Sequence, residues 1–345
     1  MPRIFVVLAA IGISASVSLA QPASSGPYRI LRTAKVGGTG GFDYVFADAV
    51  GRRLYIPRSG QGARVTVFNL DTLEPAGEIP NTNARGVAVD PKSGHGFSSS
   101  KPVAMWDTKT LAVLKTIDVQ GNPDGILFDP FNQRVWVFSH SAPNATIIDA
   151  RDGSVVGTLD LDGAPEQAVT DGNGHIYVDI EDKDNVAVVD TKALQVTAHY
   201  DISEKAKVPA GLAFDVKNQI LFVGCRNTPT MVIMTTKGKI LTALPIGAGV
   251  DGAVFNPATM ETFSSQGDGT LTVIKEKSPT SFEIAQTVQT KVGGKTLTLD
   301  SKTNQIYVIA AEYGPPPAPP PTGGRAGRGT MIPDSFSILV LGNKQ

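Results

Sequence analysis

The sequence predicts an all-β protein, a seven-bladed β-propeller built from four-stranded blades. Three observations support this prediction. A marker residue recurs seven times at an almost constant spacing, short strand-forming runs follow each marker in the same order, and the last repeat lacks a strand that the N-terminal segment can supply.

The first strand of every repeat ends in an acidic or amide residue. Successive markers lie 39 to 44 residues apart; they are Asp48, Asp90, Asp129, Asp171, Asp215, Asn256 and Asp300. At the start of a tight turn, such a side chain accepts backbone N–H groups, and a neighbouring Pro or Gly restricts the backbone. We therefore predict that the markers are structural turn residues and not catalytic acids.

Two further strand-forming runs follow each marker. In the third repeat they read RVWVF at 134–138 and ATIID at 145–149, and the other repeats carry comparable β-branched or aromatic runs bounded by turn residues. A fourth run follows, as in SVVGTLDL at 154–161. No stretch shows a helical period of adequate length. The repeats therefore predict four-stranded sheets.

The seventh repeat ends near Gly342 without a fourth strand. Residues 28–36 precede the first marker as the other fourth strands precede theirs, so we expect this N-terminal strand to close the last blade. Such closure removes the exposed sheet edges that favour aggregation.

Residues 1–20 have the features of a secretory signal peptide. A positively charged start is followed by an apolar stretch and by the small residues Ser18 and Ala20. We expect a periplasmic or secreted protein with one propeller domain at 21–345. No later run is long and apolar enough to span a membrane, and the formal net charge of -1 argues against nucleic acid as a partner. We expect a monomer.

Cys225 is the only cysteine. Disulfides within the chain are therefore excluded, and the sequence lacks the Cys-x-x-Cys-His motif that attaches a c-type haem. Its place at the end of an apolar strand predicts a buried, inert thiol.

The repeats resemble the YVTN-type β-propeller repeats of exported bacterial and archaeal proteins. The matching phrases are LFVGCRN at 221–227, NVAVVDT at 185–191 and the Asp-Pro turns. The resemblance covers essentially the whole chain after residue 20. It implies the propeller fold and leaves function open, because such propellers serve as binding scaffolds, lactonase-like enzymes and oxidoreductase subunits.

Five residues before each marker is an equivalent position at the mouth of the central channel. Its occupants are Asp43, Arg85, Asp124, Glu166, Ala210, Asp251 and Lys295. Converging carboxylates can hold a hard cation, so Asp43, Asp124, Glu166 and Asp251 are candidate ligands of a divalent cation such as Ca²⁺. Alternatively, Arg85 and Lys295 neutralise the acids in a belt of ion pairs.

The loops after the second strands open on the same face. They add Arg58 and Arg226 to the candidate ligand-binding residues Asp43, Arg85, Asp124, Glu166, Asp251 and Lys295, and they place His140 near Glu166. These two are the candidate catalytic residues, with His140 as a general base. An exposed loop histidine without a function is the alternative.

The segment 314–333 interrupts the last blade between its second and third strands. Its composition, rich in Pro and Gly and including Arg325 and Arg328, is typical of a loop that builds no core. For the whole protein we expect a binding scaffold for a small molecule or protein partner at the channel mouth. A metal-assisted, lactonase-like hydrolase and a periplasmic oxidoreductase subunit are the alternatives.

Overall fold

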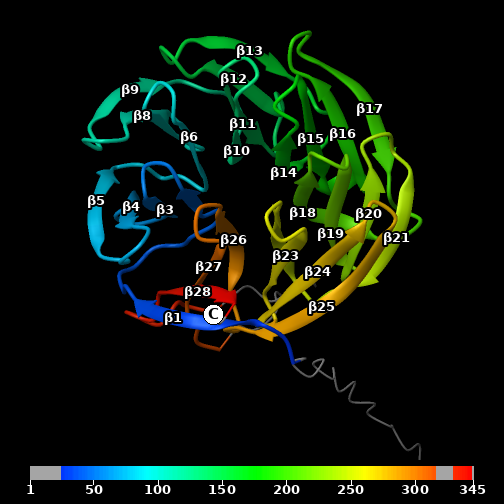
Figure 1. Ribbon diagram of the computed structural model, residues 1–345. Coiled ribbons are helices and arrows are strands. Elements are labelled where there is room, and N and C mark those ends of the chain that lie inside the picture. Colours follow the sequence, from blue (N-terminus) through cyan, green and yellow to red (C-terminus); the bar gives the residue numbers. More distant parts are fainter. Residues whose placement is uncertain (1–24, 316–328, 344–345) are drawn as a thin grey trace, which may run out of the picture.

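The computed structural model describes residues 25–315 and 329–343, which form seven four-stranded antiparallel sheets arranged in a ring (Figure 1). This confirms the predicted seven-bladed β-propeller. The predicted signal peptide at 1–20 lies outside the described residues. Among the described residues, no helical segment has the length and hydrophobicity needed to cross a membrane.

The strands follow one another outward in each of the first four blades, from the channel to the rim. The first blade contains β2 (Phe46–Asp48), β3 (Arg53–Arg58), β4 (Arg64–Asn69) and β5 (Pro75–Pro80). The second contains β6 (Val87–Asp90), β7 (His95–Ser98), β8 (Val103–Asp107) and β9 (Val113–Ile117). The third contains β10 (Pro123–Asp129), β11 (Arg134–Ser139), β12 (Ala145–Asp149) and β13 (Val155–Leu159). The fourth contains β14 (Pro165–Thr170), β15 (His175–Ile180), β16 (Asn185–Asp190) and β17 (Gln195–Asp201), with a short 3-10 helix at Glu181–Lys183.

The remaining blades follow the same order until the last one. The fifth contains β18 (Lys207–Asp215), β19 (Ile220–Asn227), β20 (Thr230–Thr235) and β21 (Ile240–Pro245). The sixth contains β22 (Val250–Asn256), β23 (Glu261–Gln266), β24 (Thr270–Ser278) and β25 (Ser281–Gln289). The seventh contains β26 (Lys295–Asp300), β27 (Gln305–Ala310) and β28 (Ser337–Asn343), and its outer strand is β1 (Tyr28–Lys35).

All seven markers form the turns that the sequence predicts. The side-chain Oδ1 of each marker accepts the backbone N–H of the residue two positions later; in the first blade Val50 N lies 3.1 Å from Asp48 Oδ1, and in the second Lys92 N lies 2.9 Å from Asp90 Oδ1. The markers therefore end the innermost strands on the face opposite the channel mouth.

Apolar side chains form the core between the blades. One hydrophobic cluster lies at each of the seven boundaries between neighbouring blades. At the boundary of the first and second blades, Tyr55 packs against Trp106 with ring centroids 6.0 Å apart. A Cβ atom at Gly96 would lie 2.3 Å from the Trp106 ring, so only glycine leaves room for this indole.

The outer strand of the seventh blade comes from the other end of the chain. β1 pairs antiparallel with β28, from Tyr28 opposite Asn343 to Lys35 opposite Ser337. Figure 1 shows the two strands side by side, one at the blue and one at the red end of the colour scale. Tyr28 also contacts the sixth blade, because its backbone N–H donates to Gln286 Oε1 over 2.9 Å and its ring packs edge-on against Phe263.

The insertion leaves the seventh blade between β27 and β28. Its ends are held together, because Gly314 N donates to Thr330 O over 2.8 Å and Ile332 N donates to Glu312 O over 2.8 Å. Residues 316–328, including Arg325 and Arg328, lie outside the described residues.

Candidate functional site

The structure brings together the six charged residues that the sequence placed at the channel mouth. Lys295 of the seventh blade has its Nζ 3.1 Å from Asp43 Oδ1, and Arg85 Nη1 of the second blade lies 3.6 Å from Asp43 Oδ2. The same guanidinium lies 3.3 Å from Asp124 Oδ1. Each of these acids therefore has a base on both sides, because Asp124 also contacts His140.

His140 and Arg226 complete the circle. His140 Nε2 lies 3.0 Å from Asp124 Oδ2 and 3.7 Å from Glu166 Oε1. Arg226 Nη1 lies 3.6 Å from Glu166 Oε1, and Arg226 Nη2 pairs with Asp251. Lys295 closes the circle, because its Nζ lies 2.5 Å from Asp251 Oδ2 and also contacts Asp43. Four acids and four bases alternate in this closed circle, which we call the charged ring.

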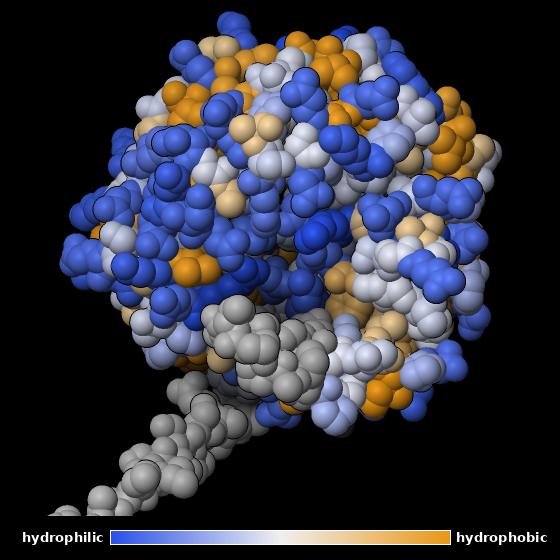
Figure 2. Space-filling model, turned by 180° about the vertical axis from the view of Figure 1, so that it is seen from behind, coloured by the Kyte–Doolittle hydropathy of each residue, from blue (hydrophilic) through white to orange (hydrophobic). Residues whose placement is uncertain are grey.

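Every blade contributes to the charged ring. The third blade provides both Asp124 and His140, and each other blade provides one member. In the fifth blade the equivalent position is Ala210, and Arg226 at the end of β19 supplies the missing charge. The guanidinium of Arg226 also binds Glu181 Oε1 at 2.5 Å. The belt of ion pairs that the sequence suggested is therefore present. Figure 2 shows a hollow at the centre of one face, surrounded by hydrophilic residues, as such a ring requires.

Burial and neighbouring charges move the pKa values of the ring in opposite directions. Burial raises the pKa of Asp43 and raises that of Glu166 to about 8. Burial also acts on Asp124, but the hydrogen bond from His140 and the charge of Arg85 outweigh it and hold the pKa of Asp124 below its usual value. The hydrogen bond to Asp124 raises the pKa of His140. These shifts favour the charged forms of His140 and Asp124 and the protonated form of Glu166.

Two residues beside the charged ring, Tyr44 and Asp179, were not identified from the sequence. Tyr44 reaches across the channel from the first blade to the fourth, where its hydroxyl donates to Glu166 Oε2 over 3.1 Å. Asp179 in β15 is fully buried, and among the described residues neither of its oxygens has a hydrogen-bond partner. Burial, and to a smaller extent the nearby Glu166 carboxyl, raises the pKa of Asp179 well above its usual value. The sequence did contain a signal for Asp179, because an acidic residue within an otherwise apolar strand is unusual.

Arg58 is the candidate residue that the structure does not bring into the ring. It is 2% exposed, and its guanidinium carbon lies 3.8 Å from the centre of the Phe336 ring. Its terminal nitrogens donate to the carbonyls of Gly37 and Gly40, each over 3.3 Å. Burial lowers its pKa to about 10. Arg58 therefore supports the Gly-rich loop above it, where Gly40 adopts a φ of 102° that a side chain would strain.

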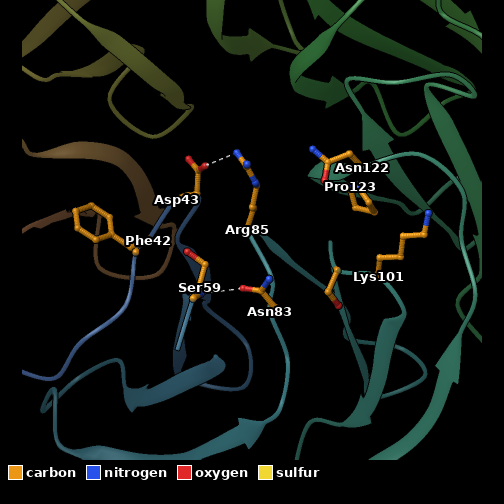
Figure 3. A pocket seen from close by; sticks show the side chains of 11 residues that line it. Phe42, Asp43, Ser59, Asn83, Arg85, Lys101, Asn122 and Pro123 are labelled. Atoms are coloured by element: carbon orange, nitrogen blue, oxygen red, sulfur yellow. Dashed lines mark hydrogen bonds and ion pairs between the residues drawn. The ribbon is translucent and has the colours of Figure 1, made fainter. Parts of the chain in front are cut away.

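A pocket of about 410 Å³ lies beside the ring between the first three blades. Arg85 and Asp43 point toward one another at its edge (Figure 3), and Lys101 lies on the far side. Its hydroxyl and amide groups come from Ser59, Asn83, Ser100 and Asn122. The side chain of Arg85 is 48% exposed, more than the 20 to 35% of the other ring bases. It is therefore the ring base that a molecule in this pocket contacts most easily.

One part of the ring offers the ligands for a cation. Asp124, His140 and Glu166 each present one ligand atom, and these atoms lie within 4.8 Å of one another. Of the four acids that the sequence suggested, Asp124 and Glu166 belong to this group, whereas Asp43 and Asp251 are both paired with Lys295. Two carboxylates with an imidazole suit a transition metal better than Ca²⁺, which prefers oxygen ligands alone.

The fold and the site define a class of protein, the seven-bladed β-propeller with an ion-paired channel mouth. Neither the models of known protein families nor the curated proteins that were searched give a match for this chain.

The pKa of Glu166 makes stability depend on pH. Because its pKa of about 8 in the folded protein lies above the value of about 4.3 in an unfolded chain, its contribution to stability is complete below pH 4 and is lost as the pH rises to about 8. The raised pKa of His140 acts in the same direction. As the pH rises through this range, the wild type should lose unfolding free energy relative to Glu166→Gln, by up to about 1.4 kcal/mol per pH unit. Urea unfolding at pH 5, 6.5 and 8 measures the difference.

The matched control is Glu283→Gln, because the side chain of Glu283 is 49% exposed in an outer strand. Its difference from the wild type at each pH gives the baseline for the loss of an exposed carboxylate. A difference for Glu166→Gln that only follows this baseline would contradict the proposed protonation of Glu166.

Proposed function

We propose that this chain is an exported binding propeller, related to the YVTN-type repeat proteins, that holds a small polar anion in the pocket beside the charged ring. The observation that carries the proposal is Arg85. Among the described residues its guanidinium contacts two acids, over 3.3 and 3.6 Å, and nearly half of its side chain is exposed toward the pocket. A carboxylate on a ligand can therefore approach it without disrupting the fold.

The pocket lining suggests the chemistry of the ligand. Arg85 and Lys101 outnumber Asp43, so the pocket has a positive surplus, and its serines and asparagines offer hydrogen bonds to hydroxyl groups. The volume of about 410 Å³ falls within the range of about 300–1,000 Å³ typical of small-molecule sites. A hydroxycarboxylate or sugar acid meets these requirements.

Arg85→Gln should weaken binding of such an anion roughly tenfold or more, because a charge-assisted hydrogen bond is lost. Isothermal titration calorimetry with gluconate, glucuronate and citrate measures the effect. Arg151→Gln is the matched control, since the side chain of Arg151 is 67% exposed and it lies away from this pocket. Equal affinity in both variants, or the absence of binding by any of the three anions at millimolar concentration, would refute the proposal.

A second candidate function, a metal-assisted hydrolase, is favoured by the grouping of Asp124, His140 and Glu166. A cation bound there would polarise a carbonyl group and activate water. Asp124 and Glu166 would hold the cation as carboxylates, with Arg226 stabilising the negative charge of Glu166, and His140 could exchange a proton with the reacting groups.

This candidate predicts that Zn²⁺ or Ca²⁺ raises the melting temperature of the wild type, because the folded state alone assembles the ligands. At one hundred times the dissociation constant, the gain in stability is about 2.7 kcal/mol. Asp124→Asn combined with Glu166→Gln should abolish the shift, whereas Asp171→Asn, on the opposite face, should leave it unchanged. A shift that survives the double change would place the cation elsewhere, and a lactone-hydrolysis assay then decides whether any cation supports turnover.

A further inference from the structure

The other end of the central channel has a different chemistry. A cavity of about 350 Å³ lies where the innermost strands end, and the innermost strands of six blades line it. Each of these blades provides at least one larger apolar residue; the lining includes Phe46, Leu127, Val169, Leu212, Phe214, Val216, Val254, Phe255 and Leu299. None of its lining residues is charged. It therefore offers an apolar surface at the opposite end from the charged ring.

The polar side chains in the lining are already engaged with the protein. Gln167 Nε2 donates to Ala253 O over 2.9 Å, and its Oε1 accepts the N–H groups of Leu212 and Ala253, each over 2.9 Å. Thr170 Oγ1 donates to Asp129 Oδ1 over 2.8 Å, and Thr298 Oγ1 accepts the N–H of Ala47 over 3.1 Å. A ligand in the cavity thus meets apolar groups.

Gln167 also links three blades. It extends from the fourth blade and binds the innermost strands of the fifth and sixth blades, one residue away from Glu166 in the charged ring. The lining residues lie between the ring positions and the marker turns, so the cavity lies toward the face that carries those turns.

The turns around this opening combine apolar and basic residues. Val50, Phe131 and Val216, which are 78%, 45% and 47% exposed, each follow the marker of an innermost strand. Exposed lysines lie in the same set of turns: Lys217 follows Val216 directly, and Lys92 and Lys302 lie in the turns of the second and seventh blades. Exposed apolar side chains around an apolar cavity are typical of a binding site, and the lysines favour an anionic group at the rim.

We propose that this end of the channel binds a medium-chain alkanoate, with its aliphatic chain in the cavity and its carboxylate among the rim lysines. The cavity is large enough for this purpose, since an apolar cavity of about 150 Å³ in a protein core already accepts benzene. Apolar contact provides the affinity, and the rim charges select an anionic head group over a cationic one.

Calorimetric titration with hexanoate, heptanoate and octanoate tests this assignment. Each added methylene should tighten binding roughly fourfold, the ratio that corresponds to its transfer free energy. Val169→Trp should weaken octanoate binding at least tenfold by filling the cavity. Val155→Trp, the same change on the exposed outer strand β13, should have no effect.

Two further variants make the test independent of the folding of Val169→Trp. Val216→Asp, at the exposed rim, should weaken octanoate binding because it places a negative charge beside the carboxylate. Lys217→Gln should also weaken octanoate binding, by a few-fold, and should make the affinity less dependent on salt. Arg85→Gln should leave it unchanged, which separates this site from the one at the channel mouth. Affinity that is independent of chain length, or that is lost with Arg85 and not with Val216, would overturn the proposal.

Discussion

A chain that lacks residues 21–36 is expected to aggregate or to melt at a sharply lower temperature than the full-length protein. Loss of β1 leaves β28 as an edge strand, and the run SILVL at 337–341, now buried throughout, would present unpaired backbone groups to other molecules. Light scattering and thermal unfolding of the purified truncated protein measure both effects.

Single substitutions in β1 provide the control. Tyr28 is 4% exposed and packs against Phe263, so Tyr28→Ala should cost about 3 kcal/mol, as is typical for a buried aromatic side chain. The neighbouring Arg29 is exposed, and Arg29→Ala should change stability by less than about 0.5 kcal/mol. A truncated protein that stays monomeric and melts like the full-length chain would show that β1 does not stabilise the ring.

Arg226→Gln is expected to destabilise the fold by about 3 kcal/mol, the cost of removing one partner from a buried ion pair. Arg226 contacts Glu166, Glu181 and Asp251 at once, and the side chains of these acids are only 9 to 25% exposed. Without the guanidinium, Asp251 retains Lys295 as a partner, but Glu181 loses the only cation within ion-pair distance among the described residues. Denaturant unfolding at pH 7 measures the loss.

Arg85→Gln is the comparison for this effect. Arg85 belongs to the same ring, but its side chain is 48% exposed and its contacts are longer, so the same change should cost less than about 1 kcal/mol. Equal losses for the two variants would mean that burial does not set the strength of the ring.

The sequence was sufficient for the features that repeat. The markers from Asp48 to Asp300 fixed the number of blades, because each turn needs an acceptor side chain at one position and the spacing then gives the blade length. The position five residues before each marker also located six members of the charged ring, since equivalent positions in a closed ring meet at its axis.

Contacts that occur in only one blade could not be predicted from the repeat pattern. The sequence placed Arg226 on the channel-mouth face, but it did not predict that this side chain takes the place that Ala210 leaves open and pairs with Glu166 and Asp251. Tyr44 spans the channel to a residue far away in the sequence. Arg58 seemed to face the channel, but the Gly-rich loop folds over it, and burial of that kind depends on the path of a loop with no regular pattern.

The pairing of β1 with β28 has a consequence for the order of events during synthesis. The ribosome makes β1 first and its partner among the last residues, so β1 has no sheet to join until nearly the whole chain is complete. Blades one to six can form their hairpins as they emerge, because their strands are neighbours in the sequence. The seventh blade can be completed only when β28 has been synthesised. Its pairing with β1 joins segments almost a whole chain length apart, and contacts of such long range slow folding. Until then β1 is an unpaired strand that a second copy of the chain could capture.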